Sequence, residues 1–425
     1  MHDPIGCFFR IRELYLTYLE TAFKITQPET ARERRAMLTT PDTLCTDPLL
    51  EPTARYRRTD WNLAELPIRL NRLVPDFGAE NAERFYRIIK AGLFTDPASR
   101  LFTHQERMLV RGLGEASPGV VTSGTGSGKT ESFLLPIIAR IVRESTTWDP
   151  PSARFLKNHW WCDTNGEPYP KFTAIPAGLR PLRANPDATP FVPHRAGEAS
   201  NRTPAVRCLI LYPMNALVED QLARLREALD GPAVRSVMDD QMRGNRIFFG
   251  RYTSSTPVTG FDLHPRIPAT ADSDRRNRQL QELFDAMLEY HQTQRRIDEM
   301  IRRGERSLKP VDRFLFPAVD GSELLTRCDM QVTPPDVLIT NVSMLSAMLT
   351  REVDSPIFER TRAWLATSED AYFYLVLDEL HLQRGSAGTE VAYLLRTLLH
   401  RLGLDQPGNR HKLRILSSSA SLPTT

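Results

Sequence analysis

Residues 120–132 read VVTSGTGSGKTES, and this run restricts the fold of the chain more than any other stretch. Two valines predict a short strand, a turn rich in glycine and serine follows, and a lysine and a threonine begin a helical stretch. Glycines let backbone N–H groups turn inward, and the positive end of a helix dipole attracts anions. The run therefore predicts a strand–loop–helix unit that binds phosphate, with an ordinary Gly/Ser turn before a helix as the alternative.

The composition of the chain supports the phosphate interpretation. Of its 55 basic residues, 7 are lysines and 48 are arginines, yet position 129 is a lysine. A compact ammonium suits a phosphate site, and a planar guanidinium would not replace it. In the pattern G-x-x-x-x-G-K-[ST], Lys129 reaches the β- and γ-phosphates and the Thr130 hydroxyl ligates Mg²⁺. Ser123 stands where the strict pattern has glycine, a departure typical of helicase loops. The residues expected to contact the nucleotide are Ser123, Gly124, Thr125, Gly126, Ser127, Gly128, Lys129, Thr130 and Glu131.

Short apolar strands alternate with helices from about residue 96 onward. Several of these strands are apolar on both faces, as is usual in a parallel sheet that helices cover. The alternation predicts an α/β fold, with a parallel sheet and helices on both of its faces. The expected strands cover residues 119–122, 205–212, 246–252, 336–340, 373–378 and 413–417, and the expected helices cover 130–143, 216–229, 342–350 and 387–402.

The first part of the chain carries helical patterns and none of the motifs. Apolar residues recur at helical spacing over 8–24 and 78–92, whereas residues 28–60 are rich in Pro, Thr and Arg and predict a loop. Two later stretches interrupt the alternation, one with ten prolines and one with a long charged helix. Long interruptions of this kind are usually functional or linker-like. The expected organisation is a helical accessory region over 1–95 and an α/β domain over 96–425, with insertions at 145–204 and 257–330.

Bulk composition excludes several classes of protein. A hydrophobic content of 41% and a charged content of 25% are ordinary for a globular protein. No apolar run approaches the roughly 20 residues of a membrane span, so we expect no membrane partner. The five cysteines are scattered and never form C-x-x-C, which argues against a disulfide framework or a zinc ribbon and for a reducing, cytoplasmic location. A net charge of +3 is too small to indicate nucleic-acid binding by itself.

A second motif supplies the acids that a phosphate site needs. The stretch FYLVLDELHL, residues 373–382, is an apolar strand that ends in two adjacent carboxylates. Such acids lie at the carboxyl edge of a parallel sheet, where ligands of these sheets bind. We expect Asp378 to hold Mg²⁺ and Glu379 to orient and deprotonate the attacking water. Alone the pair is a weak signal, but after a phosphate loop it is a strong one.

Five blocks follow one another along the chain, in the order SGTGSGKT, LYPMNALVEDQ, PPDVLITN, LVLDELHL and ILSSSASLP. These blocks, in this order, resemble those of superfamily 2 helicases of the DEAD/DEAH-box type. The match spans residues 100–425. The resemblance implies that residues 96–425 are a first RecA-like domain, which binds ATP and Mg²⁺ and tracks one strand of nucleic acid. In the family a glutamine reads adenine, and Gln105 in LFTHQERM stands at that position. For Gln105 alone, a surface helix residue is the competing interpretation.

The same resemblance implies roles for residues beyond the ATP site. In the family, two of these blocks contact the backbone of the nucleic acid, and the S-A-T block couples hydrolysis to strand movement through the histidine of the DEAH box. Strand-to-helix caps at Asn215 and Asn341, and a serine-rich strand end, are the structural alternatives. The matching positions are Pro213, Asn215, Gln221, Thr340 and Asn341 for nucleic acid, and Ser419, Ala420, Ser421 and His381 for coupling.

The box reads D-E-L-H instead of D-E-A-D, which favours DNA over RNA as the substrate. The chain resembles large bacterial DNA helicases of anti-phage defence islands, such as the Druantia and 7-deazaguanine modification systems. The resemblance lies in the stretches YPMNALVEDQL and PPDVLITNVSML and in the helical region that precedes the motifs. DNA-repair helicases of the same superfamily are an alternative. Two other classes stay open: a non-catalytic nucleic-acid scaffold that keeps the fold, and a P-loop ATPase that acts on protein.

The sequence stops at Thr425, four residues after the S-A-S block. All five blocks belong to the first RecA-like domain, so we expect the second RecA-like domain to come from a missing C-terminal part or a partner subunit. Other defence proteins are further candidate partners. Arginines supplied in phosphoryl transfer contribute a factor of about 10³–10⁵ in rate. The 425 residues are therefore expected to bind ATP–Mg²⁺ and to hydrolyse it very slowly on their own.

Overall fold

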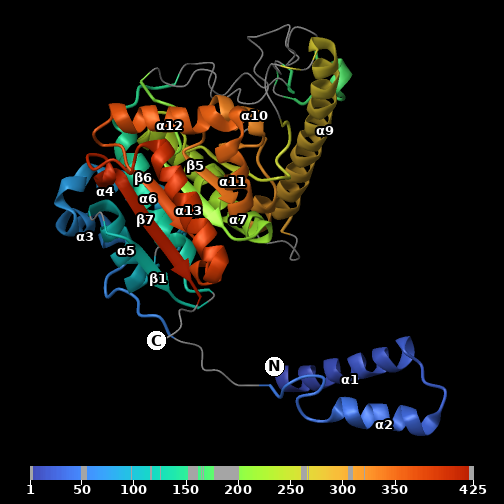
Figure 1. The fold of residues 1–425 in the computed structure, drawn as a ribbon. Helices are drawn as coiled ribbons and strands as arrows, with labels where there is room; N and C mark the ends of the chain where they lie inside the picture. Colours follow the sequence, from blue (N-terminus) through green and yellow to red (C-terminus); the bar gives the residue numbers. More distant parts are fainter. Residues whose placement is uncertain are drawn as a thin grey trace. The chain divides into compact units, whose positions relative to one another are not determined.

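The structure is a computed structural model (Figure 1), and it divides into two compact units, Met1–Arg55 and Tyr56–Thr425. The residues that it describes are 3–48, 55–96, 98–114, 117–124, 126–151, 161–163, 165, 167–176, 201–259, 266, 268–304, 310–319 and 321–420.

The first unit is a hairpin of two helices, α1 (Pro4–Ala22) and α2 (Pro28–Thr39). The prediction that residues 28–60 form a loop was wrong where α2 lies. Pro28 occupies the first turn, where its fixed φ suits a helix, and most of the residues that follow are good helix formers. Arg35 of α2 joins the hairpin through ion pairs of 2.8 Å to both Glu13 and Glu20 of α1.

The second unit is built on a sheet of seven strands, all parallel, in the order β1-β7-β6-β2-β5-β3-β4. All six expected strands are present. The additional strand is β4, whose two residues are too short to give a sequence pattern. The strands are β1 (Gly119–Thr122), β2 (Cys208–Tyr212), β3 (Phe249–Tyr252), β4 (Glu323–Leu324), β5 (Val337–Asn341), β6 (Phe373–Leu377) and β7 (Leu413–Ser419).

Helices cover both faces of this sheet, as the alternation predicted. Along β2, Cys208, Ile210 and Tyr212 pack into one hydrophobic core with α3 to α8, whereas Leu209 and Leu211 pack into a second core with α11 to α13. The helices of the second unit are α3 (Leu66–Leu73), α4 (Ala79–Gly92), α5 (Thr103–Gly114), α6 (Lys129–Ser145), α7 (Asn215–Asp230), α8 (Pro232–Gln241), α9 (Ala269–Arg302), α10 (Arg327–Val332), α11 (Val342–Thr350), α12 (Ser355–Thr367) and α13 (Gly385–Leu402).

Residues 56–95 belong to the sheet unit. Phe77, Phe85 and Ile88 of this segment are buried in the same core as α5 and α6. The helical region expected over 1–95 is therefore divided between the two units, because its second half carries an apolar face that covers the sheet.

The two stretches expected as insertions share a separate core. Trp161 and Phe172 from the first stretch pack with Leu280, Phe284 and other residues of the second. This cluster contains no residue of the seven strands. Much of what is described of both stretches thus forms one added body, with the 34-residue helix α9 as its longest element. The expected boundaries were too wide, because Trp148 packs in the first core of the sheet unit and β4, inside 257–330, is a strand of the sheet.

A buried ionic network lies where β2 and β5 begin. The Asp336 carboxylate is fully buried and accepts bonds from Arg202 (2.6 Å), from Arg207 (2.8 Å) and from the Phe248 backbone N–H (2.7 Å). Arg207 also makes a two-pronged contact with Glu144 of α6, at 2.6 and 2.7 Å. These bonds connect β2, β5, the segment before β3 and α6 at the amino ends of the strands, opposite the edge that carries the motifs.

Candidate nucleotide site

The glycine-rich loop connects β1 to α6, as the sequence predicted. Gly126 and Gly128 both have φ of +73°, a conformation that favours glycine over residues with a side chain. Two serine side chains close the loop, because Ser123 Oγ lies 2.5 Å from Ser127 Oγ and Ser127 Oγ donates to the Gly124 carbonyl at 2.8 Å. The loop is therefore held in a tight turn by its own hydroxyls. Thr125 lies outside the described residues.

Helix α6 begins at Lys129, directly after the loop. Thr130 is buried in its first turn, and Glu131 forms a 3.5 Å ion pair with Arg224 of α7. Carboxyl ends of neighbouring parallel strands meet at one edge of the sheet, and β7 lies between β1 and β6 there. This topology brings Lys129 and the acids after β6 to the same edge.

Lys129 and Glu379 are in contact at this edge. Lys129 Nζ lies 3.5 Å from Glu379 Oε1, and the two side chains are 12% and 22% exposed. Glu379 has φ of +50°, an uncommon conformation for a residue with a side chain, and it follows β6 after Asp378. Two motifs that are far apart in the sequence thus form one site, the arrangement on which the ATP interpretation depends.

Asp378 is more deeply buried than Glu379. Its carboxylate is largely buried and accepts hydrogen bonds from Ser418 Oγ and, at 2.9 Å, from the Glu379 backbone N–H. Burial raises the pKa of Asp378, and the two hydrogen bonds act in the opposite direction because they favour the charged form. A nearby cation would offset the cost of keeping this carboxylate charged.

The donor set around Asp378 suits Mg²⁺ better than a metal held entirely by protein. Among the described residues, no group of three or more His, Cys, Asp or Glu side chains is arranged to hold a metal ion. Magnesium usually keeps several waters and takes one or two carboxylates together with substrate phosphates. Asp378 and the Thr130 hydroxyl are groups of this kind, and phosphate oxygens of a nucleotide would supply the remaining protein-independent ligands.

His381 lies in a single 3₁₀ turn, Leu380–Leu382, directly after the acids. Its Nδ1 is 3.1 Å from Glu379 Oε2 and 3.3 Å from Ser419 Oγ at the end of β7. Ser419 also accepts a backbone bond of 3.1 Å from Ser123 N, so the end of β7 contacts the phosphate loop as well. Ala420 follows directly, and Ser421 lies outside the described residues.

Three residues near the loop were not anticipated from the sequence. Tyr56 accepts a 2.6 Å bond from the Gly124 N–H through its hydroxyl, and His104 Nε2 lies 3.0 Å from the Ser127 carbonyl. Ser418, which bonds Asp378, directly precedes the S-A-S block. Proximity to motif residues was a signal for His104 and Ser418, whereas nothing local marks Tyr56.

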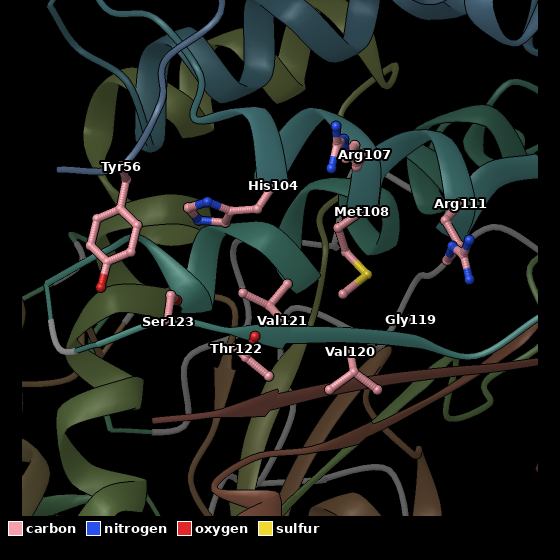
Figure 2. Close-up of a pocket in the computed structure, with 10 residues that line it drawn as sticks. All are labelled: Tyr56, His104, Arg107, Met108, Arg111, Gly119, Val120, Val121, Thr122 and Ser123. Carbon is pink, nitrogen blue, oxygen red and sulfur yellow. The ribbon is translucent and has the colours of Figure 1, made fainter. Parts of the chain in front are cut away.

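Figure 2 shows these side chains around a pocket of about 430 Å³ beside β1. Tyr56 and His104 lie near Ser123, at the loop end of the pocket, whereas Arg107 and Arg111 project from α5 farther along. Phe102 and His104 stack at a centroid distance of 5.4 Å, and Tyr56 meets each of these rings edge-on. An aromatic cluster thus adjoins the phosphate loop. The pocket is lined by Tyr56, His104, Arg107, Met108, Arg111, Gly119, Val120, Val121, Thr122 and Ser123.

Gln105 lies in the second unit beneath the loop and is 2% exposed. Its Nε2 donates to the Gly128 carbonyl at 3.1 Å, and its Oε1 accepts from the Phe102 N–H at 2.9 Å. The structure therefore brings Gln105 to the nucleotide loop, with both ends of its amide bonded to protein.

The residues expected to contact nucleic acid lie at the same edge of the sheet, where β2 and β5 end. Tyr212 is paired with Asn341 in the sheet, so Pro213 directly follows β2 beside the end of β5. Thr340 is fully buried and donates to the Tyr252 carbonyl at 2.7 Å. Asn341 caps α11 by accepting from the Met344 N–H at 2.7 Å. Asn215 begins α7, and Gln221 follows in the same helix.

Residues 102–248 match the family described as DEAD/DEAH box helicase. The chain is 32% identical over 444 residues to the Druantia protein DruE of Escherichia coli (strain UMEA 4076-1), a match that covers 99% of this chain and 20% of the relative. It thus spans about a fifth of the length of that curated relative. Two crystal structures of the DUF1998 helicase MrfA, the second bound to DNA and AMPPNP, match at 17% identity with TM-scores of 0.36 and 0.37. They cover 80% and 79% of this chain and 29% and 26% of MrfA, respectively.

Proposed function

We propose that the chain is the ATP-binding motor portion of a DNA helicase or translocase, because residues 102–248 match the DEAD/DEAH box helicase family and the chain is 32% identical to the Druantia protein DruE. The observation that carries the proposal is the 3.5 Å contact between Lys129 and Glu379. A lysine at the start of a helix after a glycine loop, facing an acid at the end of a nearby parallel strand, suits phosphoryl transfer to water.

Each side chain of the site has a role in this proposal. Lys129 binds the β- and γ-phosphates, while Thr130 and Asp378 hold Mg²⁺, which neutralises charge on the phosphates. Glu379 orients the attacking water and accepts its proton. His381 lies between Glu379 and Ser419, at 3.1 and 3.3 Å, and transmits the state of the phosphates to the end of β7.

We place the nucleic acid along the edge where β2 and β5 end. Thr340 and Asn341 already bond to the protein, so they shape this edge instead of offering free side chains. The first backbone N–H groups of α11 and the segment around Pro213 are the better candidates for phosphate contacts. Contacts of this kind position a strand without reading its sequence.

The proposed setting is a bacterial anti-phage defence system, with DNA as the substrate. The support is the relationship to the Druantia protein together with the D-E-L-H box. Since the chain spans about a fifth of that relative, we propose unwinding or translocation for the complete motor, in which a second RecA-like domain would complete the ATP site. ATP binding is the activity proposed for these residues themselves.

The test measures binding of a fluorescent ATP analogue with Mg²⁺, and ATP hydrolysis with and without DNA. Lys129→Ala is expected to abolish nucleotide binding, whereas Lys90→Ala, the same change at an exposed lysine of α4, is expected to leave it intact. Equal binding by Lys129→Ala and the wild type would refute the site. Stimulation of the complete motor by RNA and not by DNA would refute the proposed substrate.

A further inference from the structure

Strand β1 is an outer strand of the sheet, and among the described residues it pairs with β7 alone. The Ser123 N–H donates to the Ser419 carbonyl, so Ser123 faces β7. Backbone groups of successive residues in a strand face opposite sides. The N–H and C=O groups of Val120 and Thr122 therefore face the open side, where no described strand pairs with them. An outer strand of this kind is a template with which a further strand can pair.

A groove of about 430 Å³ follows this open side of β1. Residues from both faces of the strand line it, so the groove lies along the edge of β1 and not on one face. The opposite wall is α5, and Figure 2 shows Arg107 and Arg111 spaced along the direction of the strand. Among the described residues that line the groove, none is acidic. One wall thus offers backbone groups and the other offers positive charge.

The spacing of the two arginines matches the repeat of a strand. Arg107 and Arg111 are one turn apart in α5, which separates them by about 6 Å along the helix axis. Side chains on one face of a strand recur every second residue, about 6.6 Å apart. Alternate side chains of a strand added to β1 therefore come opposite the two guanidinium groups. Carboxylates are the side chains that suit guanidinium groups at such a contact.

We propose that this groove binds an extended, acidic segment of a partner protein, which adds to β1 as a further strand. Backbone hydrogen bonds to Val120 and Thr122 supply affinity, and alternate Asp or Glu side chains opposite Arg107 and Arg111 supply specificity. A nucleic-acid backbone fits less well, because phosphate oxygens only accept hydrogen bonds and leave the C=O groups of the edge unmatched. The inference does not depend on the proposed nucleotide site, to which neither arginine belongs.

The experiment measures binding of two short fluorescein-labelled peptides by fluorescence anisotropy, one alternating Glu with Val and the other alternating Lys with Val. The wild type should bind the Glu peptide at least about tenfold more tightly than the Lys peptide. Arg107→Glu, at an exposed position, should weaken binding of the Glu peptide several-fold. The double variant Arg107→Glu, Arg111→Glu should reverse the preference. Arg303→Glu, at an exposed arginine after α9, is the matched control and should change neither constant.

A wild type that binds neither peptide, or that binds both equally, overturns the proposal. So does a short oligothymidine that binds in place of the peptides and is lost in the double variant, because that result assigns the groove to nucleic acid.

Methylation of peptide nitrogens tests the strand pairing itself. Because N–H groups of a strand alternate between its two sides, methylating every Glu nitrogen or every Val nitrogen blocks pairing with β1 in only one of the two series. One methylated peptide should lose binding and the other should keep it. Amide hydrogen exchange gives a second measurement, in which Val120 and Thr122 should become protected when the Glu peptide binds. Equal effects of both methylations, or unchanged exchange at these two amides, would contradict strand addition.

Discussion

Replacing Glu379 by glutamine should strengthen ATP binding and greatly slow hydrolysis. Lys129 Nζ is buried, lies 3.5 Å from Glu379 Oε1, and makes no hydrogen bond within the described residues. An incoming triphosphate must therefore compete with the Glu379 carboxylate for this ammonium. Glu379→Gln removes the competing charge, and it also removes the repulsion between the carboxylate and the phosphates.

The size of the effect follows from the geometry of the pair. Two unit charges at this separation attract by about 5 kcal/mol at an effective dielectric constant of about 20. Desolvation and side-chain entropy cancel most of that energy, and exposed pairs are worth about 0.2–1 kcal/mol. Because both partners are mostly buried, we expect about 1–2 kcal/mol, which is about 5- to 30-fold in the dissociation constant. Loss of the general base should slow hydrolysis by about 10²- to 10⁴-fold.

The assay is an equilibrium titration of these residues with a fluorescent ATP analogue and Mg²⁺, and ATP hydrolysis is measured on the complete motor that carries the same change. Glu390→Gln, the same change at an exposed acid of α13, is the matched control and should alter neither quantity. If Glu379→Gln binds ATP as weakly as the wild type or more weakly, then Glu379 does not restrain Lys129. The interpretation that Glu379 competes with the triphosphate for Lys129 across the 3.5 Å contact would then be wrong.

Three further predictions concern stability and pH. Asp336→Ala leaves two buried guanidinium groups without their shared carboxylate and should lower the free energy of unfolding by about 3–5 kcal/mol, measured with denaturant; a loss below about 1 kcal/mol would contradict it. Ser418→Ala removes a bond that lowers the pKa of Asp378, so the acid limb of the hydrolysis–pH profile should move to higher pH, and an unmoved limb would refute this role. Burial lowers the pKa of His104, so the unfolded chain binds that proton first. The free energy of unfolding should fall as pH drops below about 6.5, and His104→Gln should flatten this dependence.

Local patterns were sufficient for most of the secondary structure. Strands such as β2 and β6 are apolar runs of five residues between helices, and that contrast is visible without any tertiary information. The prediction missed β4, which has two residues, and six helices, which are α2, α3, α5, α8, α10 and α12. β4 is defined by its pairing with β3, whereas α2 has local signals, Pro28 and the helix formers after it, which the Pro and Thr residues of the surrounding stretch outweighed.

The amino-acid sequence by itself determined which chemical groups the site contains and at which ends of strands they stand. Glycines at 126 and 128, a lysine at 129 and two acids after an apolar strand are features of residue type and spacing, so they can be read directly. Their role as one site required the strand order, because β7 had to lie between β1 and β6 to bring Ser418 to Asp378.

Tertiary structure alone decided the partners of Gln105 and Tyr56. The amide of Gln105 meets the loop because α5 packs beside α6, and the Tyr56 hydroxyl reaches the Gly124 N–H from a segment with no motif of its own. Such contacts depend on how apolar faces of distant segments are buried together. Residue type and spacing show which groups are able to form hydrogen bonds, whereas tertiary packing determines which of these groups come close enough to form them.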